Sequence, residues 1–180
     1  MNRTLAITLA GLLMTGTAIA ASPVAPLLRQ IEGLPPASAF QAATPDPVAA
    51  LLAVQADASE PAWLRLRVFD ALSEFSTDAR ARDFLVATLS QSKTAPAPPE
   101  VHAAVAVLLR DFPEEASAAL RLALIHPDVQ VRVTAGRVVQ AGTNPKLQVM
   151  LAAWLDAPGT PDVQAAKALI APPPEAKPAP

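Results

Sequence analysis

The stretch "IHPDVQVRVTAGRVVQAG", residues 125–142, has the features of a helix with one buried face. Pro127 is favoured in a first helical turn, and Asp128 is a residue type that caps the amides that follow it. Apolar or small side chains then recur at helical spacing, at Val131, Ala135, Val138 and Val139. Gly142 is a typical end of a helix. The pattern predicts a helix over 127–141.

The same apolar spacing occurs twice more upstream. Rows that begin at Leu64, Val101 and Val131 share one pattern, and rows that begin at Ala81, Ala116 and Leu147 share a second. The two patterns alternate along the chain, so the repeating unit is a pair of helices. One step between units is longer because it contains "SKTAPAP", residues 92–98, which is predicted to be a surface loop.

Prolines with Asp, Asn or Thr before them mark further helix starts, and strand signals are weak throughout. The sequence therefore predicts an all-α fold. The expected helices cover 24–32 (a short one, ending before Gly33), 46–57, 61–75, 78–91, 99–111, 113–125, 127–141, 144–156 and 161–170.

"HPDVQVRVTAGRVV" resembles the HEAT-type helical repeat family, whose second helices carry Asp-x-x-Val-Arg followed by a small residue. The matching positions are Asp128, Val131, Arg132 and Ala135. "EPAWLRLRVFDAL" and "PPEVHAAVAVLL" match it less fully. The resemblance implies a short right-handed solenoid, an α-α superhelix of about four antiparallel helix pairs over 46–171. It also implies that Asp128 and Arg132 cap helices and join neighbouring repeats.

His126-Pro127-Asp128 is also the tripeptide of J-domains, but the helix before it, "PEEASAALRLALI", has one basic residue where J-domains have several. Nor does the sequence place a nucleophile or an oxyanion site beside His126. Both histidines, His102 and His126, are therefore expected to be solvated surface residues. With no Cys and only these two His, no metal, cofactor or catalytic residue is predicted.

The first residues, "MNRTLAITLAGLLMTGTAIA", have the layout of a signal peptide over 1–20, with cleavage after Ala20. A periplasmic or secreted location is expected, with no stable membrane insertion after cleavage. An N-terminal segment, 21–45, would precede the repeats, and a disordered Pro-rich tail would occupy 172–180. The net charge of −2 and the lack of a basic run argue against binding of nucleic acid.

The outward face of the second helices is the expected binding surface. In a right-handed stack these helices line the concave side, so one continuous patch is predicted. Its members are Trp63, Arg67, Asp70, Glu74, Glu100, Ala104, Val107, Asp111, Gln130, Thr134, Arg137 and Ala141. Trp63 beside Arg67 has the composition of a binding hot spot. The alternative is that Trp63 packs under residues 24–43 or stacks on Arg67.

The expected function is an exported interaction module, an adaptor or scaffold that binds a protein or peptide without catalysis. Two alternatives stay open from the sequence. One is an inhibitor or immunity-type protein that neutralises a single enzyme or toxin, which shares the fold and differs only in partner. The other is a lyase-like enzyme on a helical-repeat fold.

Overall fold

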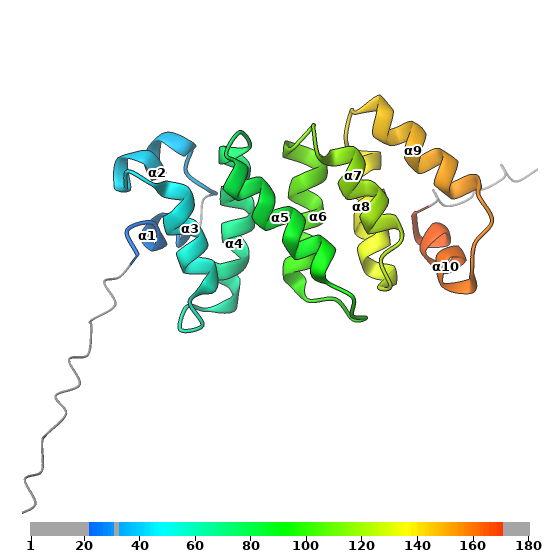
Figure 1. Ribbon diagram of the computed structural model, residues 1–180, viewed down its shortest axis with the longest axis horizontal. Coiled ribbons are helices and arrows are strands. Elements are labelled where there is room, and N and C mark those ends of the chain that lie inside the picture. The colour runs from blue at the N-terminus through cyan, green and yellow to red at the C-terminus, as the bar shows by residue number, and fades with distance from the viewer. Residues whose placement is uncertain (1–21, 31–32, 171–180) are drawn as a thin grey trace, which may run out of the picture.

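The computed structural model describes residues 22–30 and 33–170, and within these ranges the chain is all-helical, without strands. These residues form ten α-helices and one 3₁₀ turn, η1, and Figure 1 labels the α-helices. Their bounds are α1 Ala25–Leu28, α2 Ala37–Ala43, α3 Pro47–Ala56, α4 Ala62–Leu72, η1 Ser73–Phe75, α5 Ala79–Gln91, α6 Pro99–Asp111, α7 Ala116–Leu124, α8 Val129–Ala141, α9 Pro145–Asp156 and α10 Pro161–Ile170.

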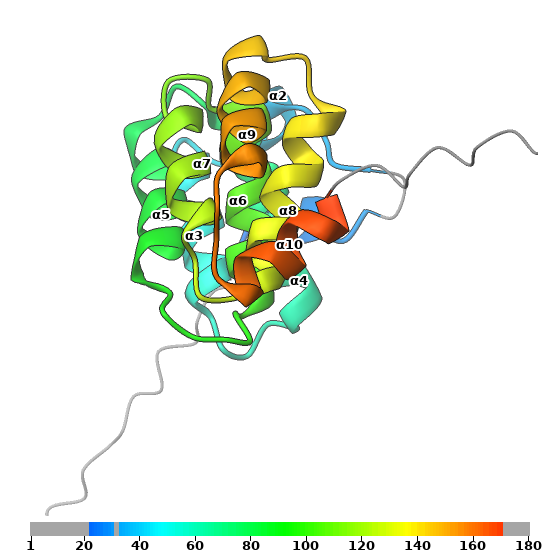
Figure 2. The ribbon, with the colours of Figure 1, turned by 90° about the vertical axis from the view of Figure 1, so that its right-hand side faces the viewer.

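The helices lie in two layers (Figures 1 and 2). Successive helices pack as pairs, α3 on α4, α5 on α6 and α7 on α8. Within one layer α4 packs on α6, α6 on α8 and α8 on α10, while α5, α7 and α9 follow one another in the other layer. The turns that lead from one pair to the next, such as 112–115 and 142–144, therefore lie along one edge of the molecule (Figure 1).

The predicted apolar rows form the core. The row from Leu64 is buried throughout, and so is the row from Val101. In the third row Val131, Ala135 and Val139 are buried, whereas Val138 is half-buried. The tilted ring contact between Phe69 and Phe84, with centroids 5.4 Å apart, joins α4 to α5. Burial of these branched and aromatic side chains is the main stabilising contribution to the fold.

The N-terminal residues close one end of the two layers. Helix α2 was not predicted, and the helix expected over 24–32 is shorter, because α1 ends at Leu28. Phe40 of α2 is fully buried and meets the ring of Phe75 edge-on at 6.1 Å. The amide of Ala37 donates to Glu74 Oε2 at 3.0 Å, so a distant side chain satisfies the first turn of α2.

Helix α10 closes the other end of the two layers. Lys167 of this helix is only 6% exposed. Its ammonium donates to the carbonyl oxygen of Leu155 at 3.0 Å and to that of Ala157, and it lies 5.1 Å from the Trp154 ring centroid. A buried lysine here satisfies carbonyl groups at the end of α9. Trp154 is partly buried and packs against the hydrophobic core.

A glycine allows α10 to approach α8 closely. A Cβ atom at Gly136 would lie 2.5 Å from Ile170 Cδ1. One turn further along α8, Gln140 Nε2 donates to the Ile170 carbonyl oxygen at 2.9 Å. The last turn of α10 is thus fixed against α8 by both packing and a hydrogen bond.

The predicted signal peptide 1–20, its cleavage site after Ala20 and the predicted tail 172–180 lie outside the described residues. Among the helices of 22–30 and 33–170, none has the length and apolar character that crossing a membrane requires.

Candidate functional site

Asp128 joins two parts of the chain at the start of α8. Its Oδ1 accepts from the amide of Gln130 at 2.7 Å, which caps the helix. Its Oδ2 accepts from the amide of Ala97 at 2.5 Å, in the loop before α6. Burial raises the pKa of Asp128, whereas the two amide hydrogen bonds lower it. The net pKa lies below its usual range. The carboxylate therefore stays charged while it holds both segments.

Arg132 reaches the helix that follows. It is 4% exposed, and its guanidinium donates to the carbonyl oxygen of His126 and, at 3.2 Å, to that of Asp162 in the first turn of α10. Asp128 thus contacts the loop that leads into α6, and Arg132 contacts α10. Both contacts link successive helix pairs. In each, the neighbouring segment contributes a main-chain group, the Ala97 amide in one and the Asp162 carbonyl oxygen in the other.

His126 is not the solvated residue that was expected, because it is 4% exposed. Its Nδ1 accepts from the amide of Asp128 at 3.1 Å, which fixes the turn between α7 and α8. That bond requires a deprotonated Nδ1. Burial lowers the pKa of His126 more than the nearby Asp128 carboxylate raises it. The neutral form of the ring is therefore the one that fits the fold.

This arrangement predicts a stability that falls in mild acid. Because the pKa of His126 is lower in the folded chain than its unfolded value of about 6.5, its contribution is complete above pH 6.5 and is lost as the pH falls below that value. One such group can change the free energy of unfolding by at most about 1.4 kcal/mol per pH unit. Urea unfolding at pH 7.5, 6.5 and 5.5 measures the slope.

His126→Asn provides the test, since the asparagine oxygen can accept the Asp128 amide without titrating. We expect the free energy of unfolding to depend less on pH between 7.5 and 5.5 in this variant, and to keep its original pH dependence in His102→Asn. An unchanged slope in His126→Asn would assign the acid sensitivity elsewhere. The carboxylates of Asp46 and Asp78, whose pKa values are lowered mainly by hydrogen bonds from Arg80, lose their contribution only below about pH 4.

Trp63, the leading binding candidate, lies on the surface. It is 51% exposed in the first turn of α4. Within the described residues the cation–π contact is that of Lys167 with Trp154, not one between Arg67 and Trp63. An exposed tryptophan of this size is available to a partner. Because Trp63 lies at the start of α4, it is on the edge of the molecule opposite the turns 112–115 and 142–144, which follow the ends of α6 and α8.

The neighbouring candidates have intramolecular partners instead. Arg67 Nη2 donates to the Gly33 carbonyl oxygen at 3.0 Å, and Glu74 accepts from Ala37 as described above. Both side chains attach the N-terminal residues to the α4–η1 segment. Asp70 lies 3.7 Å from the guanidinium of Arg110, and Asp111 lies 2.8 Å from it.

The predicted continuous patch was wrong in its middle. Ala104 and Val107 are completely buried, because the apolar residues of α6 surround nearly its whole circumference and such a helix lies in the core. Thr134 Oγ1 lies 3.1 Å from His102 Nδ1 between α6 and α8. Glu100 is half-buried, while Gln130, Arg137 and Ala141 are exposed. The exposed members thus form two separate groups, on α4 and on α8.

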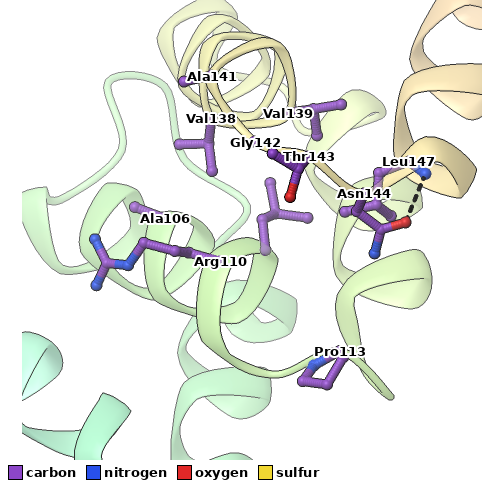
Figure 3. Close-up of a pocket in the computed structure, with 11 residues that line it drawn as sticks. Ala106, Arg110, Pro113, Val138, Val139, Ala141, Gly142, Thr143, Asn144 and Leu147 are labelled. Carbon is purple, nitrogen blue, oxygen red and sulfur yellow. Dashed lines mark hydrogen bonds between the residues drawn. The ribbon is translucent and has the colours of Figure 1, made fainter.

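A pocket of about 510 Å³ opens where α6 and α8 end (Figure 3). Its walls come from both helices, from the turn before α7 and from the turn that leads into α9. The lining residues are Ala106, Leu109, Arg110, Pro113, Val138, Val139, Ala141, Gly142, Thr143, Asn144 and Leu147. This is the volume of sites that take a small ligand or one or two side chains of a peptide.

The pocket has an apolar interior and a small number of polar groups at its rim. Asn144 Oδ1 is already engaged, since it accepts from the amides of Lys146 and Leu147 and caps α9. Figure 3 shows the Arg110 guanidinium pointing away from the hollow. The walls can therefore bind an apolar group and contain no arranged acid, base or nucleophile.

The sequence did not predict this pocket, although some of the residues that line it are small. Ala106 in the second half of α6, and Ala141 and Gly142 at the end of α8, are small residues. A short side chain at such a place leaves space that a longer one would fill. Nothing in the sequence says whether neighbouring atoms occupy that space.

Within 22–30 and 33–170, no three His, Asp or Glu side chains lie close enough together to form a metal site. Comparison of the chain with protein-family models, with curated proteins and with solved structures finds no match.

Proposed function

We propose that the chain is an exported interaction module that binds a segment of another protein and has no chemistry of its own. The observation that carries this proposal is the apolar pocket at the ends of α6 and α8, open to solvent and lined by groups suited to contact rather than catalysis. Exposed Ala141 connects the pocket to the outward face of α8. Surface hollows of this kind bind apolar side chains of partner proteins.

We also propose that the helix pairs form a short right-handed superhelix of the HEAT type. The side-by-side packing of α4, α6, α8 and α10 supports this proposal, as do the bonds of Asp128 to Ala97 and of Arg132 to Asp162. These are the roles that the repeat resemblance implies for the two residues. A superhelix would place the outward faces of α4 and α8 on one concave side.

Site-specific crosslinking in the cell envelope tests the binding proposal. A photoreactive residue at Thr143, on the pocket rim, is expected to form one dominant adduct with one protein, identified by mass spectrometry. Ala141→Phe should remove that adduct, because the new ring fills the pocket from an exposed position. Ala153→Phe, the same change at an exposed position of α9 that does not line this pocket, should leave the adduct intact.

Crosslinks that form only within the chain, or an adduct that both variants retain equally, would contradict binding at this pocket. Secretion of the protein is tested in the same cells, since export predicts that the adduct and the chain are both found outside the cytoplasm.

A further inference from the structure

Near the pocket edge, the start of α5 and the end of α6 carry arginines that are each held between two carboxylates. Arg80 lies 2.7 Å from Asp46 and 2.8 Å from Asp78. Arg82 lies 3.0 Å from Asp83 and 3.7 Å from Glu115. Arg110 repeats the arrangement with Asp70 and Asp111. Each of these three clusters has one negative charge in excess, so the arginines are not available to an anionic ligand.

A second hollow continues the pocket along this edge. It has a volume of about 290 Å³ and lies on the other side of the turn 112–115. Pro113 lines both hollows. The second is lined by Ser76, Thr77, Asp78, Arg82, Phe112, Pro113, Glu114 and Glu115. Its charged groups are thus three carboxylates and a single guanidinium, in contrast to the apolar interior of the first.

Glu114 is the carboxylate most accessible to a partner. It is exposed, and within the described residues it forms no ion pair, whereas Asp78 and Glu115 already face arginines. The hollow at the turn 112–115 is therefore the acidic part of this edge, and it lies beside the apolar first pocket.

We propose that the occupant is an extended peptide segment in which an apolar side chain is followed closely by a lysine or arginine. The apolar side chain fills the pocket between α6 and α8, and the cation crosses Pro113 to reach Glu114 and Glu115. Charge complementarity selects this class, since an acidic segment would meet the like charges of the second hollow. This inference rests on the proposed function and specifies the partner of the same site.

Arrays of synthetic nonapeptides test the inference. The protein used is the predicted mature chain, residues 21–180. Every peptide has a central Leu among Ala, Ser and Pro, and three sets carry two Lys, two Gln or two Glu beside the Leu. We expect the Lys set to bind at least tenfold more tightly than the Gln and Glu sets at low salt. Raising the salt should reduce that preference, because the contact is exposed.

Two variants locate the contact. The double variant Glu114→Gln and Glu115→Gln should reduce binding of the Lys set to the level of the Gln set, and Glu100→Gln, at the opposite end of α6, should not. Thermal unfolding of each variant verifies that it is folded. Equal binding of all three sets, with loss in Ala141→Phe, would overturn the charge inference and leave the proposed function standing.

Two further outcomes would each overturn the inference. A Lys preference that survives the double variant would place the basic contact elsewhere and overturn the inference. Failure of every set to bind would overturn it as well, whereas the proposed function would then be judged by the Thr143 crosslink alone.

Discussion

Asp128→Ala is expected to lower the free energy of unfolding by about 2–4 kcal/mol. The substitution removes the N-cap of α8, a loss of about 1 kcal/mol. It also leaves the amide of Ala97 without its acceptor in a partly buried place, which costs about 1–3 kcal/mol. Urea denaturation with two-state analysis measures the change.

Asn144→Ala is the matched control, because Asn144 caps α9 through Lys146 and Leu147 and, among the residues that the structure describes, has no distant partner. It should cost about 1 kcal/mol. Asp128→Asn keeps the cap but turns its amide group toward Ala97. Its loss of unfolding free energy should therefore lie between those of Asp128→Ala and Asn144→Ala. If Asp128→Ala and Asn144→Ala cost the same, the bond to Ala97 contributes nothing to stability.

Gly136→Val is expected to destabilise the chain by about 2–3 kcal/mol, near the upper part of the range for overpacked cores. Even the first carbon of the new side chain would meet Ile170 Cδ1 at 2.5 Å and Ile170 Cγ1 at 2.8 Å, so either the Ile170 side chain must change its rotamer or α10 must move away from α8. Thermal or urea unfolding gives the loss. Ala153→Val, at an exposed position of α9, should stay within about 0.5 kcal/mol of the original chain.

A double-mutant cycle identifies the clash. Ile170→Ala alone leaves a cavity and costs about 2–5 kcal/mol. Combined with Gly136→Val it should cost less than the sum of the single changes, by about 0.5–3 kcal/mol, because the valine then occupies the space. Strict additivity would show that α10 does not pack on Gly136.

Helices whose signals are local were predictable from the sequence. Pro145 after Asn144 marks the start of α9, and Asp78 marks the start of α5, since caps and prolines act within one turn. Helix α2 lacks such a signal. Its first amide is satisfied by Glu74, a partner brought near only by the fold, and no local pattern reveals it.

The candidate site was less predictable for the same reason. Helical spacing gives the direction of a side chain relative to its own helix, and it placed Trp63 and Arg137 outward. It does not show what lies opposite, so Ala104 and Val107 were assigned to the surface although they are buried. The pocket depends on the separation of two helix ends, a distance set by packing across the layers.

The attachment of α10 suggests how such a chain can gain or lose length. Arg132 and Gln140 donate to main-chain oxygens of Asp162 and Ile170, groups that every residue type possesses. Gly136 differs from these groups, because it needs a side chain of suitable shape opposite it. A duplicated helix pair inserted after α8 would supply acceptors for Arg132 and Gln140 whatever its sequence, so these two hydrogen bonds favour growth by duplication.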